Sequence, residues 1–287
     1  MAAVKETILN INPDAAIVDV SHSVKPQAVE QAAFLLSCVL PYFRRGSIHV
    51  VVVDPGVGTQ RRGLALSTDE GVFVGPDNGV LSPALNDEEH QSGVDGARLV
   101  ELSAGKQAFA LTNPHFQLSP LSDTFHGRDV FGPAAAHIAL GVKPSDLGSR
   151  VDEIVALPPF RAIRTDNGRL IGRIIHIDRF GNSITTIHTD QLSSPGVCIN
   201  IAGREIHGLC RSYADGNGLE ALIGSSGFLE VAVNCGSAAD TLGLGSATAF
   251  RYDLLRGRRP PAPARRPSGA LQASSQGIST DNKASAP

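Results

Sequence analysis

The chain has 287 residues, of which 42% are hydrophobic and 18% charged, a composition typical of globular proteins with one large domain or two ordinary ones. The net charge is −3, but the tail after Leu255 is basic, with five Arg, one Lys and one Asp. Residues 1–255 are therefore acidic, which argues against a nucleic-acid partner. No apolar segment reaches transmembrane length, and Lys5 and Glu6 interrupt any apolar signal segment, so we expect a cytoplasmic protein without membrane contact.

The first half of the chain alternates predicted helices and strands. Apolar spacing predicts a helix over 3–11 and a strand over 15–22, and Pro26 opens a predicted helix over about 27–43. Further strands are predicted at 48–53, 64–67, 72–74 and 97–102, and an Ala-rich helix from about 129 to 141. This alternation predicts an α/β domain over residues 1–155 with a mainly parallel sheet.

The second half is predicted to be all β. Two prolines mark residues 156–168 as a linker. Alternating apolar and polar residues then predict strands over 169–178, 183–187, 197–209, 219–224, 228–234 and 246–254. They indicate an antiparallel, barrel-like domain over 169–255. Residues 256–287 have almost no large apolar side chain and are predicted to be disordered.

Four cysteines occur in the chain, at positions 38, 198, 210 and 235. They form no CxxC pair and no Cys/His pattern with zinc spacing. We therefore expect free thiols in a reducing compartment, no metal site and no cofactor.

The first candidate site follows the apolar run 48–53. Asp54 begins a Pro-Gly-x-Gly turn, and the adjacent Arg61 and Arg62 come after it. Loops at the carboxyl ends of strands are where open α/β sheets bind ligands. The alternative is a polar strand end with a solvated Arg pair. The third glycine of a dinucleotide-binding motif is replaced by Arg61, and the chain contains no P-loop motif, which argues against both kinds of nucleotide site.

Three further clusters carry polar chemistry. His126 precedes a predicted helix and could serve as a general base or orient a water, although a structural role is the alternative. The segment 178–182 offers a carboxylate, an aromatic face and an amide for an amine and a purine, or forms an ordinary β-turn. The Gly-flanked serines of 224–227 could hold a carboxylate, or form only a turn.

Taken together and in this order, five motifs resemble one family. DPGVGTQRR, VGPDNGVL, TFHGRDVF, IDRFGNSITTI and GSSGFLEVAVNCGSA are similar to segments of the S-adenosyl-L-methionine hydroxide adenosyltransferases, relatives of fluorinase and chlorinase. The resemblance runs from about residue 3 to 253. It implies an N-terminal α/β domain, a C-terminal barrel-like domain, and a homotrimer with active sites between subunits. The implied reaction is hydrolysis of S-adenosyl-L-methionine to adenosine and L-methionine, by attack of water or hydroxide at the ribose C5′.

The resemblance also implies roles for particular residues. The family's catalytic triad falls on Asp54, Arg61 and His126, and because the halogenases lack this triad, its presence favours water over halide as the nucleophile. The implied substrate contacts are Phe125, Phe180 and Tyr213 (aromatic packing on the nucleoside), Asn182, Asn234 and the backbone near Cys235 (adenine), Asp178 (the methionine amino group), and Ser225 and Ser226 (the methionine carboxylate). The implied reaction needs no metal.

Two departures from the family pattern bear on activity. The family begins with a strand ending in an Asp-Phe-Gly-like motif, whose Asp holds the ribose hydroxyls, whereas this chain begins inside the following helix. We therefore expect the first strand and its acid to be missing. Gln27 also stands where the family often has an aromatic residue. The missing acid leaves open a weak or inactive protein that binds S-adenosyl-L-methionine or adenosine. A halide-using adenosyltransferase is a separate alternative.

Overall fold

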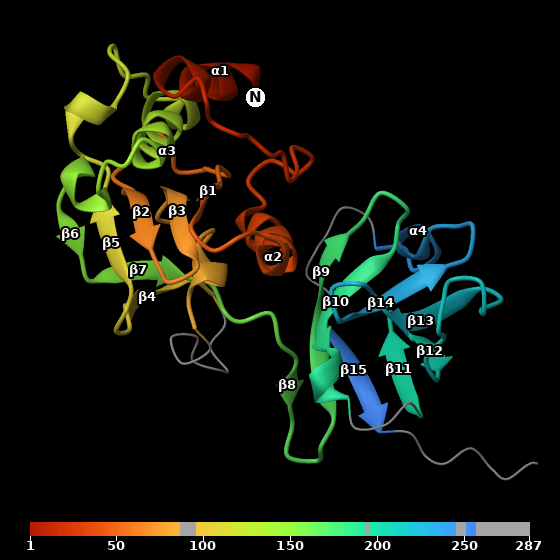
Figure 1. Cartoon of the computed structure of the whole chain (residues 1–287). Helices are drawn as coiled ribbons and strands as arrows, with labels where there is room; N and C mark the ends of the chain where they lie inside the picture. The colour runs from red at the N-terminus through yellow and green to blue at the C-terminus, as the bar shows by residue number, and fades with distance from the viewer. Residues whose placement is uncertain (87–95, 193–195, 245–250, 257–287) are drawn as a thin grey trace, which may run out of the picture. The chain divides into compact units, whose positions relative to one another are not determined.

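The computed structural model describes residues 1–86, 96–192, 196–244 and 251–256, with only the backbone of the last segment (Figure 1). Helix α1 (Ala2–Ile11) begins the chain, as predicted from its apolar spacing. Helix α2 (Val29–Val39) is shorter than predicted, because Pro41 lies in a separate 3₁₀ turn (Leu40–Tyr42). The Ala-rich segment forms a wide π-type turn (Gly127–Phe131) that continues into α3 (Gly132–Ala139).

A five-stranded sheet forms the centre of the N-terminal half, in the order β1-β3-β2-β5-β6 (Figure 1). Its strands are β1 (Ser47–Val50), β2 (Gly63–Ser67), β3 (Gly71–Pro76), β5 (Gln107–Ala110) and β6 (Arg150–Val151). A separate antiparallel pair consists of β4 (Arg98–Glu101) and β7 (Glu153–Ala156).

The expectation of a mainly parallel sheet is wrong. Among the described strands of this sheet, β1 and β3 form the one parallel pair, and the other pairings are antiparallel. The reason is local: a tight turn closed by the Thr68 N–H donating to the Gly71 carbonyl joins β2 to β3. Strands joined by so short a turn pair as an antiparallel hairpin, whereas parallel neighbours require a long crossover. The N-terminal sheet is therefore mixed.

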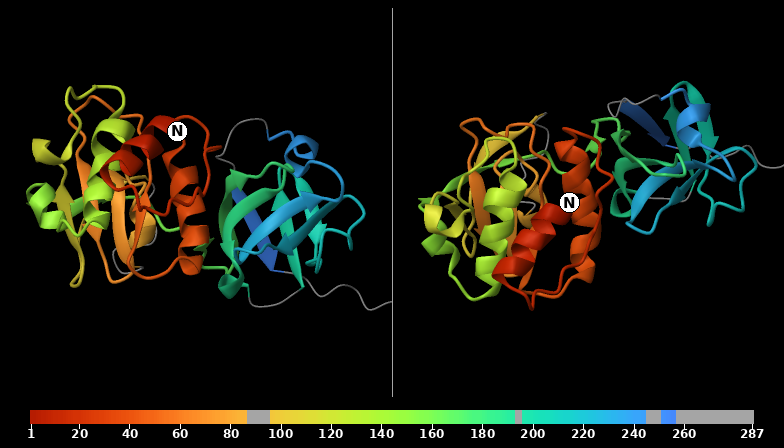
Figure 2. Two further views of the ribbon diagram at one scale, coloured as in Figure 1. Left: turned by 45° about the horizontal axis from the view of Figure 1, so that its top comes forward. Right: turned by 90° about the horizontal axis from the view of Figure 1, so that it is seen from above.

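Buried side chains pack on both faces of this sheet. One core contains Ala32 and Leu36 of α2 against Leu64, Leu66 and Phe73 of the sheet. The other contains Phe131, Ala134 and Ala135 of the π-type turn and α3 against Ala65 and Val74. Successive strand residues point to opposite faces, so β2 and β3 contribute to both cores. Figure 2 shows the helices and strands of this layered arrangement from two further directions.

The strand predicted at 15–22 is absent. The segment has no regular secondary structure and pairs with no strand of the described residues, and its side chains remain accessible, with Val18 69% and Val20 49% exposed. Strand β1 is the end strand of the sheet, and no described strand pairs with its outer backbone edge. An alternating apolar pattern becomes a strand only where a neighbouring strand completes its hydrogen bonds, and here the neighbouring position is open.

The C-terminal half is an antiparallel sheet in the order β12-β11-β15-β9-β10-β14-β13, with β8 (Ile163–Arg164) paired beside β9. The remaining strands are β9 (Leu170–Ile177), β10 (Ser183–His188), β11 (Val197–Ile201), β12 (Arg204–His207), β13 (Leu219–Ile223), β14 (Phe228–Val233) and β15 (Arg251–Arg256), and a short helix α4 (Ala238–Thr241) follows β14. The core of this C-terminal sheet contains Ile174, Ile187, Ile201, Leu229 and Val231.

Two expectations about this sheet need correction. Among the described strands no ladder joins the end strands β12 and β13, so the sheet is not closed into a barrel. The chain between them, residues 208–218, consists mainly of turns and loop, which leaves too few paired residues for closure. The single strand predicted over 197–209 is a hairpin, because Ala202 and Gly203 both have positive φ (49° and 74°), as a tight type I′ turn requires.

The predicted disordered tail lies outside the described residues, except Arg256 at the end of β15. In the part of the chain that the structure covers, no helix has both the length and the apolar character needed to cross a bilayer.

Candidate active site

The loop after β1 brings two predicted catalytic residues together with a third from a distant segment. Arg61 Nε donates to Asp54 Oδ1 at 2.8 Å, and Arg61 Nη2 pairs with Asp54 Oδ2, a two-pronged ion pair. Arg61 Nη2 also contacts His126 Nδ1 at 2.9 Å. The side chains of Arg61 and Asp54 are only 11% and 7% exposed. The three residues therefore form one hydrogen-bonded group, largely withdrawn from solvent.

Two features of the chain hold this loop in place. Gly58 has φ of +75°, and a Cβ there would lie 2.6 Å from the Asp123 carbonyl oxygen, so only glycine allows the loop to pack against the segment that leads to His126. The Arg61 guanidinium carbon lies 5.2 Å from the centroid of the fully buried Phe131 ring. A cation over an aromatic face is stabilised electrostatically, so Phe131 supports Arg61 from within the core.

The contact with Arg61 determines the protonation of His126. A guanidinium group has only donors, so His126 Nδ1 must accept the hydrogen bond and carry no proton. In this arrangement the neutral imidazole has its proton on Nε2. His126 can therefore donate a hydrogen bond from Nε2 to a water, while the acceptors in the group are the remaining lone pairs of Asp54.

Neighbouring charged residues have structural roles. Arg62 Nε donates to Asp77 at 2.8 Å, and Arg62 Nη2 donates to the Glu153 carbonyl at 2.9 Å. The fully buried Asp129 accepts from Arg128 Nη2 and from the Ser122 backbone, each at 2.9 Å. The hydrogen bond from Arg128 lowers the pKa of Asp129 and outweighs the opposing effect of burial. These pairs hold loops beside the triad. The Arg128 guanidinium carbon also lies 5.0 Å from the centroid of the Phe125 ring, so the two side chains pack together.

In the C-terminal sheet, the segment predicted to bind amine and purine forms a tight turn. Asp178 Oδ1 accepts from the backbone N–H groups of Phe180 and Asn182 at 2.8 and 2.9 Å, and Asp178 Oδ2 accepts from the Asn182 side chain at 3.0 Å. The segment therefore forms the β-turn that was the alternative prediction. The Phe180 ring is 77% exposed and available to a ligand.

Tyr213 is held by a buried acid that sequence reasoning missed. The Tyr213 hydroxyl donates to Glu230 Oε2 at 2.8 Å, and Glu230 is only 7% exposed. Burial raises the pKa of Glu230 above its usual range. Burial, and then the hydrogen bond to Glu230, raise the pKa of Tyr213 to about 12. The available signal was a single acidic residue inside the apolar strand FLEVAV, where one face is buried.

The remaining predicted contacts lie in turns at the two ends of β14. Ser225 and Ser226 occupy the turn before it, which is closed by the Gly227 N–H donating to the Gly224 carbonyl at 3.0 Å. Asn234 and Cys235 follow it and are exposed, with the Cys235 thiol 3.4 Å from the Asn234 side-chain oxygen.

The structure therefore contains two groups of predicted site residues. Asp54, Arg61 and His126 form the first. Asp178 and Tyr213 belong to the second, since the charge of Asp178 contributes to the raised pKa values of both Tyr213 and Glu230. In the described residues, no hydrogen bond or ion pair of the triad reaches the C-terminal sheet.

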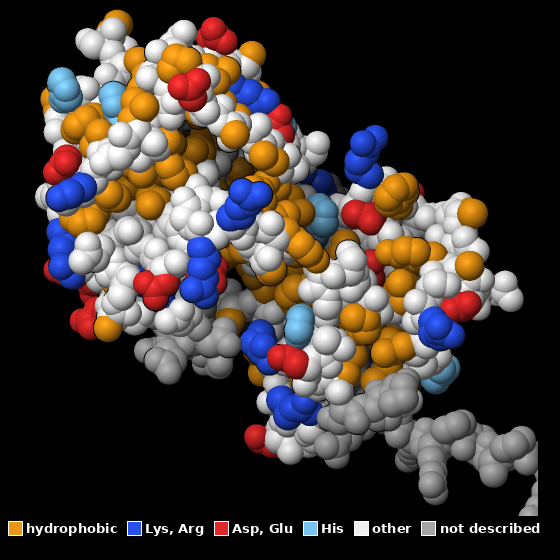
Figure 3. Space-filling view, viewed as in Figure 1, with side chains coloured by type: hydrophobic (Ala, Val, Ile, Leu, Met, Phe, Trp, Pro, Cys, Tyr) orange, Lys and Arg blue, Asp and Glu red, His pale blue; other side chains and the backbone are white. Residues whose placement is uncertain are grey.

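A cavity of about 1190 Å³ lies next to the triad. Asp54, Phe125 and His126 line one part of it, and β1, the segment 15–22 and apolar residues of the three N-terminal helices line the rest. In the space-filling view, apolar side chains gather around a hollow in the N-terminal part of the molecule (Figure 3). The cavity thus connects the outer edge of β1 with the catalytic candidates.

We expect Tyr213 to ionise about two pH units above an ordinary tyrosine, because its neutral form is favoured by burial and by the nearby Glu230. The raised pKa of Tyr213 stabilises the folded state below pH ~10, and this stabilisation is lost as the pH rises toward 12. A stopped-flow pH jump, read as tyrosinate absorbance against a Tyr213→Phe control, should give a midpoint near 12, and Glu230→Gln should lower it. A wild-type midpoint near 10 would contradict the Tyr213–Glu230 contact.

Comparisons with known proteins identify relatives of the whole described chain. The family models described as SAM hydroxide adenosyltransferase N-terminal domain and C-terminal domain match residues 1–148 and 172–251. The chain is 39% identical over 249 residues to the (R)-S-adenosyl-L-methionine hydrolase of Thermus thermophilus, covering 85% of this chain and 90% of that protein. The fluorinase of Actinopolyspora mzabensis is more distant, with 27% identity over 69% of this chain and 70% of its own. The crystal structure of an uncharacterized conserved protein from Thermotoga maritima superposes with a TM-score of 0.75 at 29% identity, covering 89% of this chain and 94% of that one.

Proposed function

Because this chain belongs to the SAM hydroxide adenosyltransferase family, we propose that it hydrolyses S-adenosyl-L-methionine to adenosine and L-methionine. The observation that carries the proposal is the hydrogen-bonded group of Asp54, Arg61 and His126. It places a fixed cation, a carboxylate and an imidazole N–H in one nearly buried position. These are the groups that bind a water molecule and stabilise its developing hydroxide character.

The proposed reaction is an in-line displacement at the ribose C5′. The oxygen of water forms a bond to C5′, the C5′–S bond breaks, and its electron pair remains on sulfur as the neutral thioether of methionine. The water loses one proton, for which Asp54 provides the acceptor, while His126 Nε2–H orients the oxygen. Arg61 stabilises the negative charge that develops on that oxygen. The positive charge of the sulfonium disappears as the bond breaks, so a site withdrawn from bulk water favours the reaction.

We assign the C-terminal group to substrate binding. The lone pairs of Asp178 that its turn leaves free would accept the methionine ammonium group, and the exposed Phe180 would pack on the nucleoside. Tyr213, oriented by Glu230, would pack on adenine. Ser225 and Ser226 are assigned to the methionine carboxylate, and Phe125, Asn182, Asn234 and Cys235 to the nucleoside.

Product analysis tests the proposed function. Incubation with S-adenosyl-L-methionine, followed by chromatography, should yield adenosine and L-methionine in equal amounts. The same incubation in excess chloride should give no 5′-chloro-5′-deoxyadenosine. Calorimetry that shows binding without any product would instead support a binding protein, and a halogenated product would support a halide-using transferase.

We further propose that the cavity beside β1 accepts one more β-strand along the outer edge of β1. Three features support this. Among the described residues, no strand pairs with the outer edge of β1 or with the segment 15–22, and both line the same cavity together with apolar side chains. A strand in this position would pair with β1 and end near Asp54 and His126, where an acidic residue could hold the ribose hydroxyls.

An extension upstream of Met1 provides a direct test. An apolar strand ending in Asp-Phe-Gly should raise the Tm by on the order of 10 °C, because it buries several apolar side chains and pairs the β1 edge. It should also raise kcat/KM. The matched extension ending in Asn-Phe-Gly should keep the gain in Tm but lose the gain in kcat/KM. A strand interrupted by proline should lose both, and an equal Tm for all three chains would contradict the proposal.

We also propose a homotrimer in which the C-terminal group of one subunit completes the site of the next. The cavity beside the triad is lined, among the described residues, by residues 1–139 alone, which supports a site open to a second subunit. Light scattering should give about three times the chain mass of 30.0 kDa. Refolding inactive Arg61→Ala together with inactive Asp178→Ala should restore activity at about a quarter of the sites. No recovery from a mixed trimer would contradict sites shared between subunits.

The division into an α/β domain over 1–155, a linker over 156–168 and a β domain over 169–255 remains our proposal. The change from the mixed sheet to the antiparallel sheet between β7 and β9 supports it. A cytoplasmic location is likewise proposed, since all four cysteines are free thiols. Limited proteolysis should cut within 156–168, and fractionation should place the protein with cytoplasmic markers.

A further inference from the structure

The β11–β12 hairpin gathers three potential metal ligands on one face. Its register pairs Cys198 with His207 and Asn200 with Glu205. Side chains alternate between the two faces of a strand, so Glu205 and His207, two positions apart, share a face. Cys198, directly opposite His207, shares that face as well. The grouping therefore follows from the backbone pairing of the hairpin.

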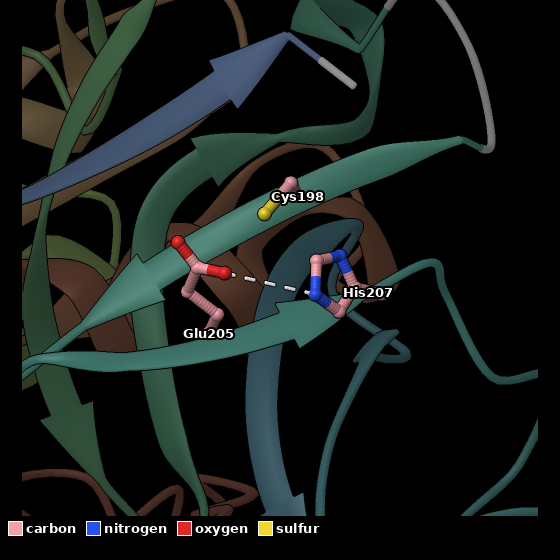
Figure 4. A group of neighbouring side chains, drawn as sticks. All are labelled: Cys198, Glu205 and His207. Carbon is pink, nitrogen blue, oxygen red and sulfur yellow. Dashed lines mark ion pairs between the residues drawn. The ribbon is translucent and has the colours of Figure 1, made fainter. Parts of the chain in front are cut away.

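The ligand atoms are close and accessible. The Cys198 sulfur, one Glu205 oxygen and one His207 ring nitrogen lie within 4.8 Å of one another, and Glu205 Oε2 is 3.7 Å from His207 Nε2 (Figure 4). The side chains of Glu205 and His207 are 55% and 74% exposed, so they can adjust around an ion.

The opposite face of the hairpin anchors these ligands. Ile199, Ile201 and Ile206 alternate with the ligand residues and are buried in the core of the C-terminal sheet. A fixed backbone with mobile side-chain ends allows the ligand atoms to close on an ion without disturbing the sheet.

We propose that Cys198, Glu205 and His207 bind a divalent transition-metal ion, with Zn²⁺ as the best match. Thiolate and imidazole ligands select against Mg²⁺ and Ca²⁺, which prefer oxygen donors. Zn²⁺ accepts sulfur, nitrogen and carboxylate oxygen in a tetrahedral arrangement, so three protein ligands leave a fourth position for water. Binding replaces the thiol proton of Cys198 and releases it to solvent. This site is independent of the proposed hydrolase site.

The sequence shows no sign of this group because its spacing matches no zinc motif. Seven positions separate Cys198 from Glu205, and the tight turn at Ala202 and Gly203 brings them together. Without the hairpin register, one cysteine, one glutamate and one histidine in a polar stretch carry no signal. The competing interpretation is an exposed ion pair of Glu205 and His207 beside an unrelated cysteine, which would bind no metal.

Co²⁺ titration of the full chain distinguishes these interpretations. A cobalt ion bound to a thiolate absorbs in the near ultraviolet by sulfur-to-metal charge transfer. We expect this band to saturate at one equivalent of Co²⁺ and to disappear when Zn²⁺ is added. Cys198→Ser should abolish the band, His207→Gln should weaken binding, and Cys235→Ser, which removes an exposed cysteine elsewhere, should leave the band unchanged.

Three results would overturn the proposal. They are a titration without a saturable band, a band that survives Cys198→Ser, and a band lost in Cys235→Ser. Circular dichroism of each variant checks that it is folded, and His207→Gln tests the site even if Cys198→Ser is unstable, since His207 is exposed. None of these readouts depends on the hydrolase activity.

Discussion

Arg61→Ala is expected to lower kcat for S-adenosyl-L-methionine hydrolysis by about 10²–10³-fold, the usual cost of removing one group that stabilises charge in a transition state. The substitution removes the cation that contacts both Asp54 and His126. It also leaves the nearly buried Asp54 carboxylate without its ion-pair partner. The rate of adenosine formation under saturating substrate measures the effect.

Two control variants make this result specific. Arg61→Lys keeps the charge but loses the planar, two-pronged contact with Asp54, so its kcat should lie between those of the wild type and Arg61→Ala. Arg150→Ala removes an arginine whose ion pair with Asp152 is highly exposed, so it should leave kcat unchanged. If Arg61→Ala and Arg150→Ala have the same kcat, Arg61 takes no part in the mechanism.

Phe131→Ala is expected to lower the free energy of unfolding by about 3–5 kcal/mol, as for other fully buried phenylalanines. Phe131 is 0% exposed and lies in the core beneath α3, where a Cβ on Gly63 would come within 3.0 Å of its ring. The substitution also removes the aromatic face under the Arg61 guanidinium. Urea unfolding monitored by circular dichroism measures the change.

The matched control for this substitution is Leu140→Ala. Leu140 is 56% exposed at the end of α3, so its loss should change the free energy of unfolding little. Phe131→Leu should be intermediate, because it keeps part of the buried volume. If Phe131→Ala unfolds at the same urea concentration as Leu140→Ala, Phe131 does not hold the core on which Arg61 packs, and this description of the core is wrong.

The hydrogen-bonded group proposed as catalytic could be predicted from the sequence only in part. The motifs around Asp54, Arg61 and His126 indicated that these residues act together. Their spacing contained no information on hydrogen bonds, so the contact of Arg61 with His126 Nδ1, and hence the proton on Nε2, required the structure. The role of Asp178 in its own turn was anticipated as an alternative, because Asp, Gly and Asn together favour β-turns.

The errors in the predicted fold arise from pairing between strands, which local patterns do not determine. Alternating elements predict a parallel sheet, but the short connection between β2 and β3 makes them an antiparallel hairpin. The segment 15–22 has a strand-like pattern but no neighbour to pair with. Glu230 was missed because its partner Tyr213 lies on a distant loop. For Glu230 the deciding contact lies far along the chain, where no local pattern shows it.

The most direct measurement of the central claim is the origin of the oxygen in the product. The protein is incubated with S-adenosyl-L-methionine in water labelled with heavy oxygen, and the adenosine is analysed by mass spectrometry. Attack of water at C5′, activated by Asp54, Arg61 and His126, predicts one labelled oxygen on the 5′-hydroxyl and unlabelled L-methionine. Unlabelled adenosine, or no adenosine formed by a folded protein, would contradict the account.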